Sequence, residues 1–366
     1  NTPAGTAVFS YSRDGIVVSE VGVPASPPTK LGRVFVDYRT GGGTTSTNTG
    51  IAMVNRGNDT AHITFTLRDS TGLSVATGHT TLAPNAHVAL VDGGGYTTMA
   101  VLMNTNPAAN AFETGKLQLF QDDGSPLVVK QAGGVTGSTF AYNIPPGGVF
   151  VFQSDGSPSF THSGWAQVFP DSGTTSPVGA GVFSFTQGGV LVTESGTPSA
   201  TPTTHARIYV DKSGAHDTGL AVANPAGTPL DVTVNAFQMD GVTSAGASLG
   251  RVHLSGNGHT AAFVGQFISS LPSGFTGVLD VSAPLPFVAL TLRSLTNARN
   301  DFLLTTFPIA DFSQTPVAPL VFPQIADGGG YLTQIILLST STSIPATVTI
   351  RYFNNDGIPL ALSSEH

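Results

Sequence analysis

Two internal sequence repeats constrain the fold of this chain more than any other feature of its sequence. Residues 8–24, VFSYSRDGIVVSEVGVP, return at 182–198 as VFSFTQGGVLVTESGTP, which sets a first offset of 174 in residue number. Residues 92–106, DGGGYTTMAVLMNTN, return at 327–341 as DGGGYLTQIILLSTS, which sets a second offset of 235. Internal similarity of this size indicates a chain built from related units. The two different offsets indicate that the units are not all of the same length, so some of them are truncated.

The recurring segments have the pattern of β-strands. Apolar and polar residues alternate in runs such as ARIYVD (206–211), DVTVNAFQ (231–238) and PFVALTLRSL (286–295), and Gly, Pro, Asn and Asp bound these runs. Short strands at intervals of about 8–12 residues are typical of a β-sandwich. The predicted fold class is therefore all-β: tandem immunoglobulin-like β-sandwich domains of two alternating types, some present only as half-units.

The repeats divide the chain into five segments. Residues 203–312 form the X unit and residues 91–202 the Y unit. Residues 29–90, the half-X segment, match the front half of the X unit. Residues 1–28 and 313–366, the N-terminal and C-terminal half-Y segments, match the last two strands and the front half of the Y unit. The alternation in the X unit predicts a core of Ile208, Val210, Leu220, Val222, Val232, Val234, Leu279, Val281, Leu290 and Leu292.

The half-X segment lacks part of the X pattern. Leu82 to His87 match Leu254 to His259 at an offset of 172, but from Asp92 onward the second offset, 235, applies. The difference between these two values, 63, corresponds to the stretch that holds GVLDV, FVALTL and FLLTTF in the X unit. One explanation is that the chain is a segment of a longer one, with an unseen stretch closed up between Leu90 and Val91.

The other explanation is that the half-units of neighbouring chains complete one another. Strands of the N-terminal half-Y segment would then add to the C-terminal half-Y segment of the next chain. A head-to-tail contact of this kind propagates as a filament. The interface residues predicted on this basis are Val8, Phe9, Ile16, Val17, Val18, Ile335, Leu337, Val348 and Ile350.

Composition excludes several classes of function. The chain has no Cys, which rules out disulfides, Cys-ligated metal and thiol catalysis. A net charge of −8 without a basic run argues against nucleic acid as a partner. No apolar stretch approaches the roughly 18–20 residues of a membrane helix. Only 10% of residues are charged, against about 25% in an average soluble protein, and the resulting Thr/Ser/Gly-rich surface favours an extracellular location.

Several runs resemble a known class of repeat. TGLAVANP (218–225), FTGVLDVSAPLPFVALTLRS (275–294), FLLTTFPIAD (302–311), VFPQIADGGGYLTQIILLS (321–339) and IPPGGVFVFQSDGSP (144–158) resemble immunoglobulin-like repeat modules of large secreted and cell-surface proteins of soil bacteria. The resemblance covers essentially the whole chain. It implies an exported β-sandwich array of the adhesin, stalk or fibre kind, and it carries no catalytic residues to transfer.

The candidate ligand residues are few. Asp211 and Asp217, in the segment DKSGAHD, are weak calcium candidates, because the spacing departs from that of a calcium loop and the first copy keeps only Asp37. Trp165, the single Trp, is interpreted as a core anchor rather than a carbohydrate platform. The Asp-Gly-Gly-Gly runs at 92–95 and 327–330 are interpreted as bends ahead of strands, not phosphate loops.

Charged residues recur in pairs between the copies. Glu20 and Glu194, Asp37 and Asp211, and Arg33 and Arg207 occupy matching positions, as do His87 and His259. Recurrence in every unit favours ion pairs that fix neighbouring units or strands over acid–base chemistry. The His residues are interpreted as turn residues, because no nucleophile motif accompanies them.

The sequence therefore predicts a non-catalytic extracellular structural or adhesive repeat protein that uses no cofactor. Its predicted partners are further copies of itself, joined head to tail, or neighbouring domains of a longer chain. The alternative is an array of accessory modules that binds carbohydrate or another surface, with surface glycans as partners.

Overall fold

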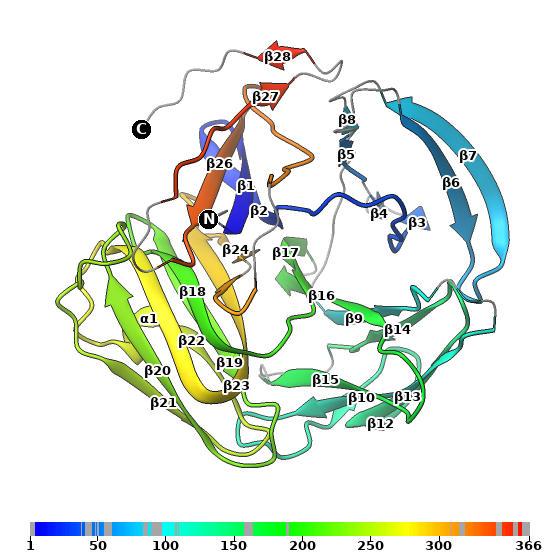
Figure 1. Cartoon of the computed structure of the whole chain (residues 1–366), viewed down its shortest axis with the longest axis horizontal. Coiled ribbons are helices and arrows are strands. Elements are labelled where there is room, and N and C mark those ends of the chain that lie inside the picture. The colour runs from blue at the N-terminus through cyan, green and yellow to red at the C-terminus, as the bar shows by residue number, and fades with distance from the viewer. Residues whose placement is uncertain are drawn as a thin grey trace.

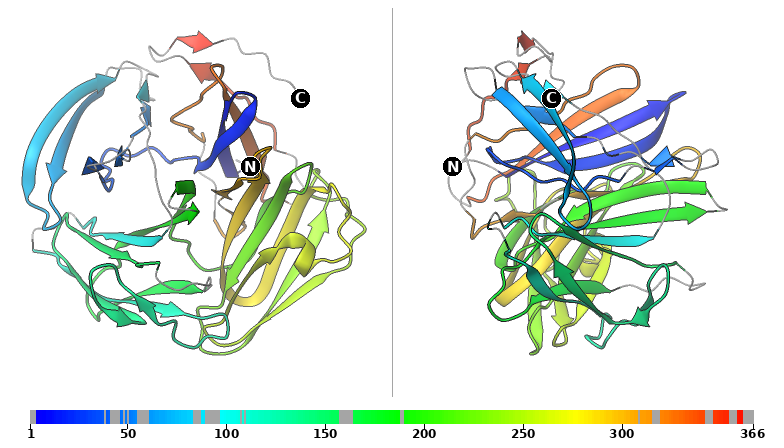
Figure 2. Two further views of the ribbon diagram at one scale, coloured as in Figure 1. Left: turned by 180° about the vertical axis from the view of Figure 1, so that it is seen from behind. Right: turned by 90° about the vertical axis from the view of Figure 1, so that its right-hand side faces the viewer.

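The computed structural model of the chain confirms the all-β class. Strands account for 57% of the residues, and the sheets are antiparallel. The one helical element among the described residues is a single turn, α1 (Val264–Phe267). The structure describes residues 4–37, 39–40, 46–47, 49, 51–54, 61–82, 87–88, 97–106, 108, 110–156, 164–187, 190–307, 309–314, 319–341, 346–353 and 358–360. Its sheets follow one another around a common centre (Figures 1 and 2).

The X unit contains the largest core. Its strands form two layers, with the order β21-β20-β23-β18-β25 in one and β22-β19-β23-β24 in the other. The strands are β18 (Thr203–Asp211), β19 (His216–Ala223), β20 (Leu230–Phe237), β21 (Gly250–Leu254), β22 (His259–Phe263), β23 (Thr276–Thr296), β24 (Phe302–Phe307) and β25 (Ala310–Asp311). The strand β23 runs through both layers, so the segments predicted as two strands are one.

Eight of the ten predicted core residues of the X unit are buried, and two are not. Leu290 and Leu292 are only half-buried, whereas Phe287, Ala289 and Thr291 face the core. The cause is that β23 is one continuous strand, whereas its two halves were predicted as separate strands. Val281 in the first half and Phe287 and Ala289 in the second lie an even number of residues apart, so alternation along the whole strand points them inward and points Leu290 and Leu292 away from the core.

The Y unit is built of two smaller sheets. One has the order β14-β9-β16-β17 and the other β13-β10-β15, with the short pair β11–β12 beside them. The strands are β9 (Thr98–Met103), β10 (Glu113–Phe120), β11 (Val129–Lys130), β12 (Thr136–Gly137), β13 (Thr139–Ile144), β14 (Val149–Gln153), β15 (Trp165–Pro170), β16 (Val178–Gln187) and β17 (Val190–Pro198). Leu117, Leu119, Phe140 and Phe152 form a core cluster between them.

The two ends of the chain meet in one sheet of order β2-β1-β26. The N-terminal half-Y segment forms a hairpin of β1 (Ala4–Arg13) and β2 (Ile16–Pro24), which we call the N-terminal hairpin. Asp14 and Gly15 at its tip both have positive φ, as a two-residue hairpin turn requires. The partner strand is β26 (Tyr331–Leu338) of the C-terminal half-Y segment, which lies directly beside β1 in Figure 1. A further short pair, β27 (Tyr352–Phe353) with β28 (Pro359–Leu360), follows β26.

The half-X segment contains only two-stranded pairings among its described residues. The strands are β3 (Arg39–Thr40), β4 (Ser46–Thr47), β5 (Met53–Val54), β6 (Ala61–Arg68), β7 (Ser74–Leu82) and β8 (His87–Val88), paired as β3–β4, β5–β8 and β6–β7. The β6–β7 hairpin lies at the periphery in Figure 1. The predicted Leu90/Val91 junction lies outside the described residues.

Candidate assembly site

The strand pairing at the junction of the two ends repeats a pairing inside the Y unit. In the Y unit, β16 pairs with β9 so that Val178 lies opposite Met103 and Ala180 opposite Val101. At the junction, β1 pairs with β26 so that Ala4 lies opposite Leu338 and Thr6 opposite Ile336. The first offset of the sequence repeat relates β1 to β16, and the second relates β9 to β26. The N-terminal hairpin and β26 therefore correspond to three of the four strands of the β14-β9-β16-β17 sheet, and they pair within a single chain.

The hairpins themselves also match. The β1–β2 hairpin pairs Thr6 with Pro24 and shifts its register between Tyr11 and Ser12. The β16–β17 hairpin pairs Ala180 with Pro198 and shifts between Phe185 and Thr186. Both irregularities lie at the same position of the repeat, since the first offset separates them. A bulge kept at the same place in two copies indicates that the sequence, and not the surroundings, determines the hairpin geometry.

The structure brings together some of the predicted interface residues. Val8 and Phe9 on β1 lie in the strand that pairs with Ile335 and Leu337 on β26, and Val8 is fully buried. Ile16, Val17 and Val18 lie on β2, one strand away from β26, and the Val17 carbonyl accepts a hydrogen bond from Asn297 of the X unit. Val348 and Ile350 lie outside the strands, with 46% and 47% of their surfaces exposed.

A buried ion network joins the N-terminal hairpin to the X unit. Arg293 on β23 donates to Glu20 of β2 and to Asp211 of β18, each over 2.9 Å. The three side chains are 7%, 3% and 7% exposed. Ser10 donates a further hydrogen bond to Glu20 over 3.0 Å, and Ser184 does the same to Glu194 in the Y unit.

Glu20 and Asp211, one member of each recurring carboxylate pair, thus lie in an ion network whose cation was not predicted. Arg207 binds Asp280 over 2.6 Å within the X unit, and Arg293 joins the recurring carboxylates. Arg293 has no counterpart in the half-X segment, because it falls in the stretch of the X pattern that the half-X segment lacks. Arg293 therefore does not recur between the copies and could not be recognised from the repeat.

The Asp211 carboxylate is ionised well into the acid range. Burial alone would raise the pKa of Asp211, but the hydrogen bonds from Ser213 and the guanidinium of Arg293 outweigh burial and bring the pKa below its ordinary 3.8. A carboxyl whose folded-state pKa is depressed stabilises the fold above its unfolded-state pKa. It loses that contribution as the pH falls through the folded-state pKa.

We therefore expect the stability of the chain to fall as the pH is lowered below about 4, the ordinary range of an aspartate pKa in the unfolded chain, and to keep falling until Asp211 of the folded chain is protonated at lower pH. Urea unfolding followed by circular dichroism between pH 7 and pH 2.5 measures this loss. Asp211→Asn should be less stable at pH 7 and should show a shallower loss in acid. Asp14→Asn is the matched control, because Asp14 is 90% exposed. An equal loss of unfolding free energy between pH 7 and pH 2.5 in the wild type and in Asp211→Asn would contradict this explanation.

A second contact surface lies between the two equivalent hairpins. The strand β24 packs against β2 on one side and β17 on the other. Gly22 N–H donates to Thr305 Oγ1 on the β2 side, and Thr306 Oγ1 donates to the Gly196 carbonyl on the β17 side. Gly22 and Gly196 are repeat equivalents. The strand β24 of the X unit therefore contacts the equivalent glycine of both hairpins, through its N–H in one and its carbonyl in the other.

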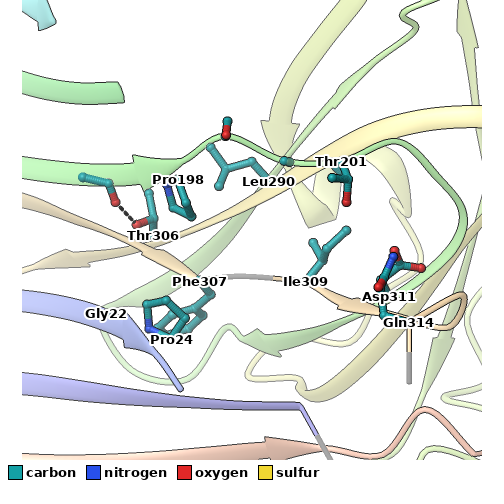
Figure 3. Close-up of a pocket in the computed structure, with 14 residues that line it drawn as sticks. Gly22, Pro24, Pro198, Thr201, Leu290, Thr306, Phe307, Ile309, Asp311 and Gln314 are labelled. Atoms are coloured by element: carbon teal, nitrogen blue, oxygen red, sulfur yellow. Dashed lines mark hydrogen bonds between the residues drawn. The ribbon is translucent and has the colours of Figure 1, made fainter. Parts of the chain in front are cut away.

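A small cavity of about 280 Å³ remains where these strands meet (Figure 3). Its lining includes Gly22 and Pro24 from one hairpin, Gly196 and Pro198 from the other, and Phe307 of β24. Asp311 is the carboxylate in its lining, and it accepts hydrogen bonds from Thr203 and Ser313. This largely apolar lining resembles a packing gap between repeats.

Contacts between strand ends and turns join the Y unit to the X unit. His259, which was predicted to be a turn residue, is instead the first residue of β22. The ring Nδ1 of His259, a residue only 8% exposed, lies 2.9 Å from the Asp122 carboxylate. The backbone N–H of His259 donates to the backbone carbonyl of Asp122. The indole N–H of Trp165 donates to the Asn257 carbonyl over 2.9 Å, and its ring stacks on Phe120. Trp165 is therefore a contact between units, not a buried core anchor. The side chain of His87 lies outside the described residues.

A repeated arginine contact joins each X-type segment to the following Y-type strand. Arg207 Nη1 donates to the Ser339 carbonyl over 3.1 Å, and Arg33 Nη1 donates to the Asn104 carbonyl over 2.9 Å. The first offset separates the two arginines, and the second separates the two carbonyls. The recurring arginines could be recognised in the sequence, but their acceptors could not. The acceptors are backbone carbonyls, which every residue type has, so no particular side chain marks them.

The calcium candidates are occupied by cationic side chains. Asp211 binds Arg293, and Asp217 accepts from Lys212 Nζ over 3.0 and 3.1 Å. The part of the chain that the structure describes holds no group of three or more His, Asp or Glu side chains suited to a metal ion. Within the same residues, no helix has the length and apolar character needed to cross a membrane.

Comparison of the chain with known protein families, curated proteins and solved structures found no match.

Proposed function

We propose that this protein is a non-catalytic extracellular structural or adhesive protein. In this proposal its immunoglobulin-like β-sandwich units assemble head to tail by strand complementation between the terminal half-Y segments. The observation that carries the proposal is the register of β1 on β26, which reproduces that of β16 on β9. The sheet is therefore formed by two segments far apart in the sequence, and such a sheet can form from two chains as well as from one.

The contacts across the junction favour exchange as a single piece. The β1–β26 pairing, the contact between the tilted rings of Tyr11 and Tyr331 and the Glu20–Arg293 ion pair all involve the N-terminal hairpin on one side. A hairpin that leaves its own β26 and pairs with that of a neighbour takes all these contacts with it. Such an exchange conserves the interactions of the closed chain and is a low-cost route to assembly.

The proposal is tested by electron microscopy of the purified chain at increasing concentration. The structure supplies a matched variant, because Tyr11 and Tyr331 are paired residues and the chain has no Cys. Tyr11→Cys with Tyr331→Cys, oxidised in dilute solution, locks the hairpin onto its own β26. We expect filaments from the wild type and none from the locked variant until it is reduced. Single closed particles at every concentration would contradict the proposal, as would filaments from the locked variant.

A further inference from the structure

The β6–β7 hairpin of the half-X segment is the counterpart of β20–β21 in the X unit. Residues 61–72, AHITFTLRDSTG, align without a gap with residues 230–241, LDVTVNAFQMDG. The strands β6 and β20 have the same length, and each forms an antiparallel hairpin with the next strand. The surroundings of β20 therefore show what a β6-type strand contacts when its unit is complete.

In the X unit, β20 has a second neighbour, β23. Val234 lies opposite Val281 and Ala236 opposite Leu279, and all four side chains are buried. In the half-X segment, β6 pairs with β7 and with no third strand among the described residues. The counterparts of Val234 and Ala236 are Phe65, which is half-buried, and Leu67, which is 47% exposed.

The counterpart of β18, the strand on the other side of β23, is also uncovered in the half-X segment. In the X unit β23 lies between β20 and β18, and β18 carries the fully buried Ile208 and Val210. Their counterparts in the half-X segment, Val34 and Val36, are 56% and 44% exposed, and residues 32–37 form no strand. The same sequence pattern is thus a buried strand where β23 pairs with it and an exposed coil where the half-X segment has no such strand.

The X unit and the half-X segment also share a recurring arginine, Arg207 in the first and Arg33 in the second. Arg207 binds the Asp280 carboxylate of β23 through Nε and Nη2, over 2.6 and 2.9 Å, while its Nη1 binds the Ser339 carbonyl. Arg33 already makes the equivalent Nη1 bond to Asn104. Within the described residues, Arg33 forms no ion pair. The half-X segment therefore keeps the arginine that recognises an acidic residue in a β23-type strand.

We propose that the half-X segment binds, between β6 and residues 32–37, an extended strand of the β23 type supplied by a separate polypeptide. The strand carries aliphatic residues at alternate positions and an aspartate between two of them, as in GVLDVSA (277–283). Its aliphatic side chains cover Phe65, Leu67, Val34 and Val36, and its aspartate pairs with Arg33. The β23 strand of a second copy is not the source, because it is buried in its own X unit.

The experiment titrates the full chain with a capped synthetic peptide of residues 275–284, FTGVLDVSAP, by isothermal titration calorimetry. The locked Tyr11→Cys, Tyr331→Cys chain is used, so that the N-terminal hairpin cannot exchange and failure of the filament proposal does not affect the result. We expect saturable binding of one peptide per chain. A peptide with Asn in place of the residue corresponding to Asp280 should bind at least tenfold more weakly, because it leaves the Arg33 charge unpaired.

Two protein variants complete the test. Arg33→Gln should weaken binding of the aspartate peptide at least tenfold, and it should remove the difference between the aspartate and asparagine peptides. Arg13→Gln, at an exposed arginine, should leave binding unchanged. Absence of saturable binding would overturn the proposal, as would equal binding of both peptides to the unsubstituted chain. Self-association of the locked chain without peptide binding would identify a second copy as the occupant and would also overturn it.

Discussion

Replacement of Arg293 by alanine should lower the free energy of unfolding by about 3–5 kcal/mol. The substitution leaves Glu20 and Asp211 buried, close together and without their shared cation. Removing one partner of a buried ion pair is strongly destabilising because it leaves an uncompensated charge in the interior. Urea unfolding followed by circular dichroism measures the loss. Hydrogen exchange should show the greatest loosening in β1 and β2.

The chain provides a matched control for this experiment. Arg299 pairs with Asp301 near the surface, where the arginine side chain is 53% exposed, so Arg299→Ala should cost less than about 1 kcal/mol. Glu20→Gln should cost less in the Arg293→Ala background than in the wild type, because the two residues share one interaction. A loss below about 1 kcal/mol for Arg293→Ala, or additive effects of the two substitutions, would refute the ion network as the link between hairpin and X unit.

Replacement of Val8 by aspartate should destabilise the chain by about 4 kcal/mol or more. Val8 is fully buried on β1, in a cluster with Tyr209 and Phe307 of the X unit, and Ile336 and Leu338 of β26 pack against this cluster. The substitution removes a buried aliphatic group and places a carboxylate where no partner is available. Thermal unfolding and limited proteolysis of residues 1–28 measure the effect.

The repeat again supplies the control. Val182 is the equivalent of Val8 in the Y unit, but it is only half-buried. Val182→Asp should therefore cost less than half as much as Val8→Asp. Similar losses for the two substitutions would indicate that the N-terminal hairpin is not covered by the X unit and β26 as the structure describes.

The sequence repeat predicted the strand pairing at the ends of the chain, but not which chain supplies the partner. The two offsets together contain the register, because residues that are repeat equivalents of a bonded pair form a bonded pair. Sequence similarity says nothing of chain identity. In the structure β1 meets β26 of the same chain, and the exchange between chains remains our proposal.

Two other features lay beyond the sequence for physical reasons. The partner of Glu20 and Asp211 is Arg293, which is brought to them by the passage of β23 through both layers of the X unit. The second feature is the continuity of β23, which was predicted as two strands. Counted from Val281 along one unbroken strand, alternation points Leu290 and Leu292 away from the core, but alternation within a short predicted strand does not show which of its two faces is buried.

The pairing of β1 with β26 is tested most directly by the register of disulfide formation. Paired residues of antiparallel strands have Cα atoms about 4.5–5.5 Å apart, within reach of a disulfide, whereas residues two positions out of register are beyond it. Cysteines at Tyr11 and Tyr331, which are partners, should therefore oxidise rapidly in dilute solution to a monomer with one internal disulfide. Cysteines at Tyr11 and Thr333, which are out of register, should remain reduced under the same conditions. Equal oxidation of the two pairs, or oxidation of neither, would show that the N-terminal hairpin does not complete the sheet of β26.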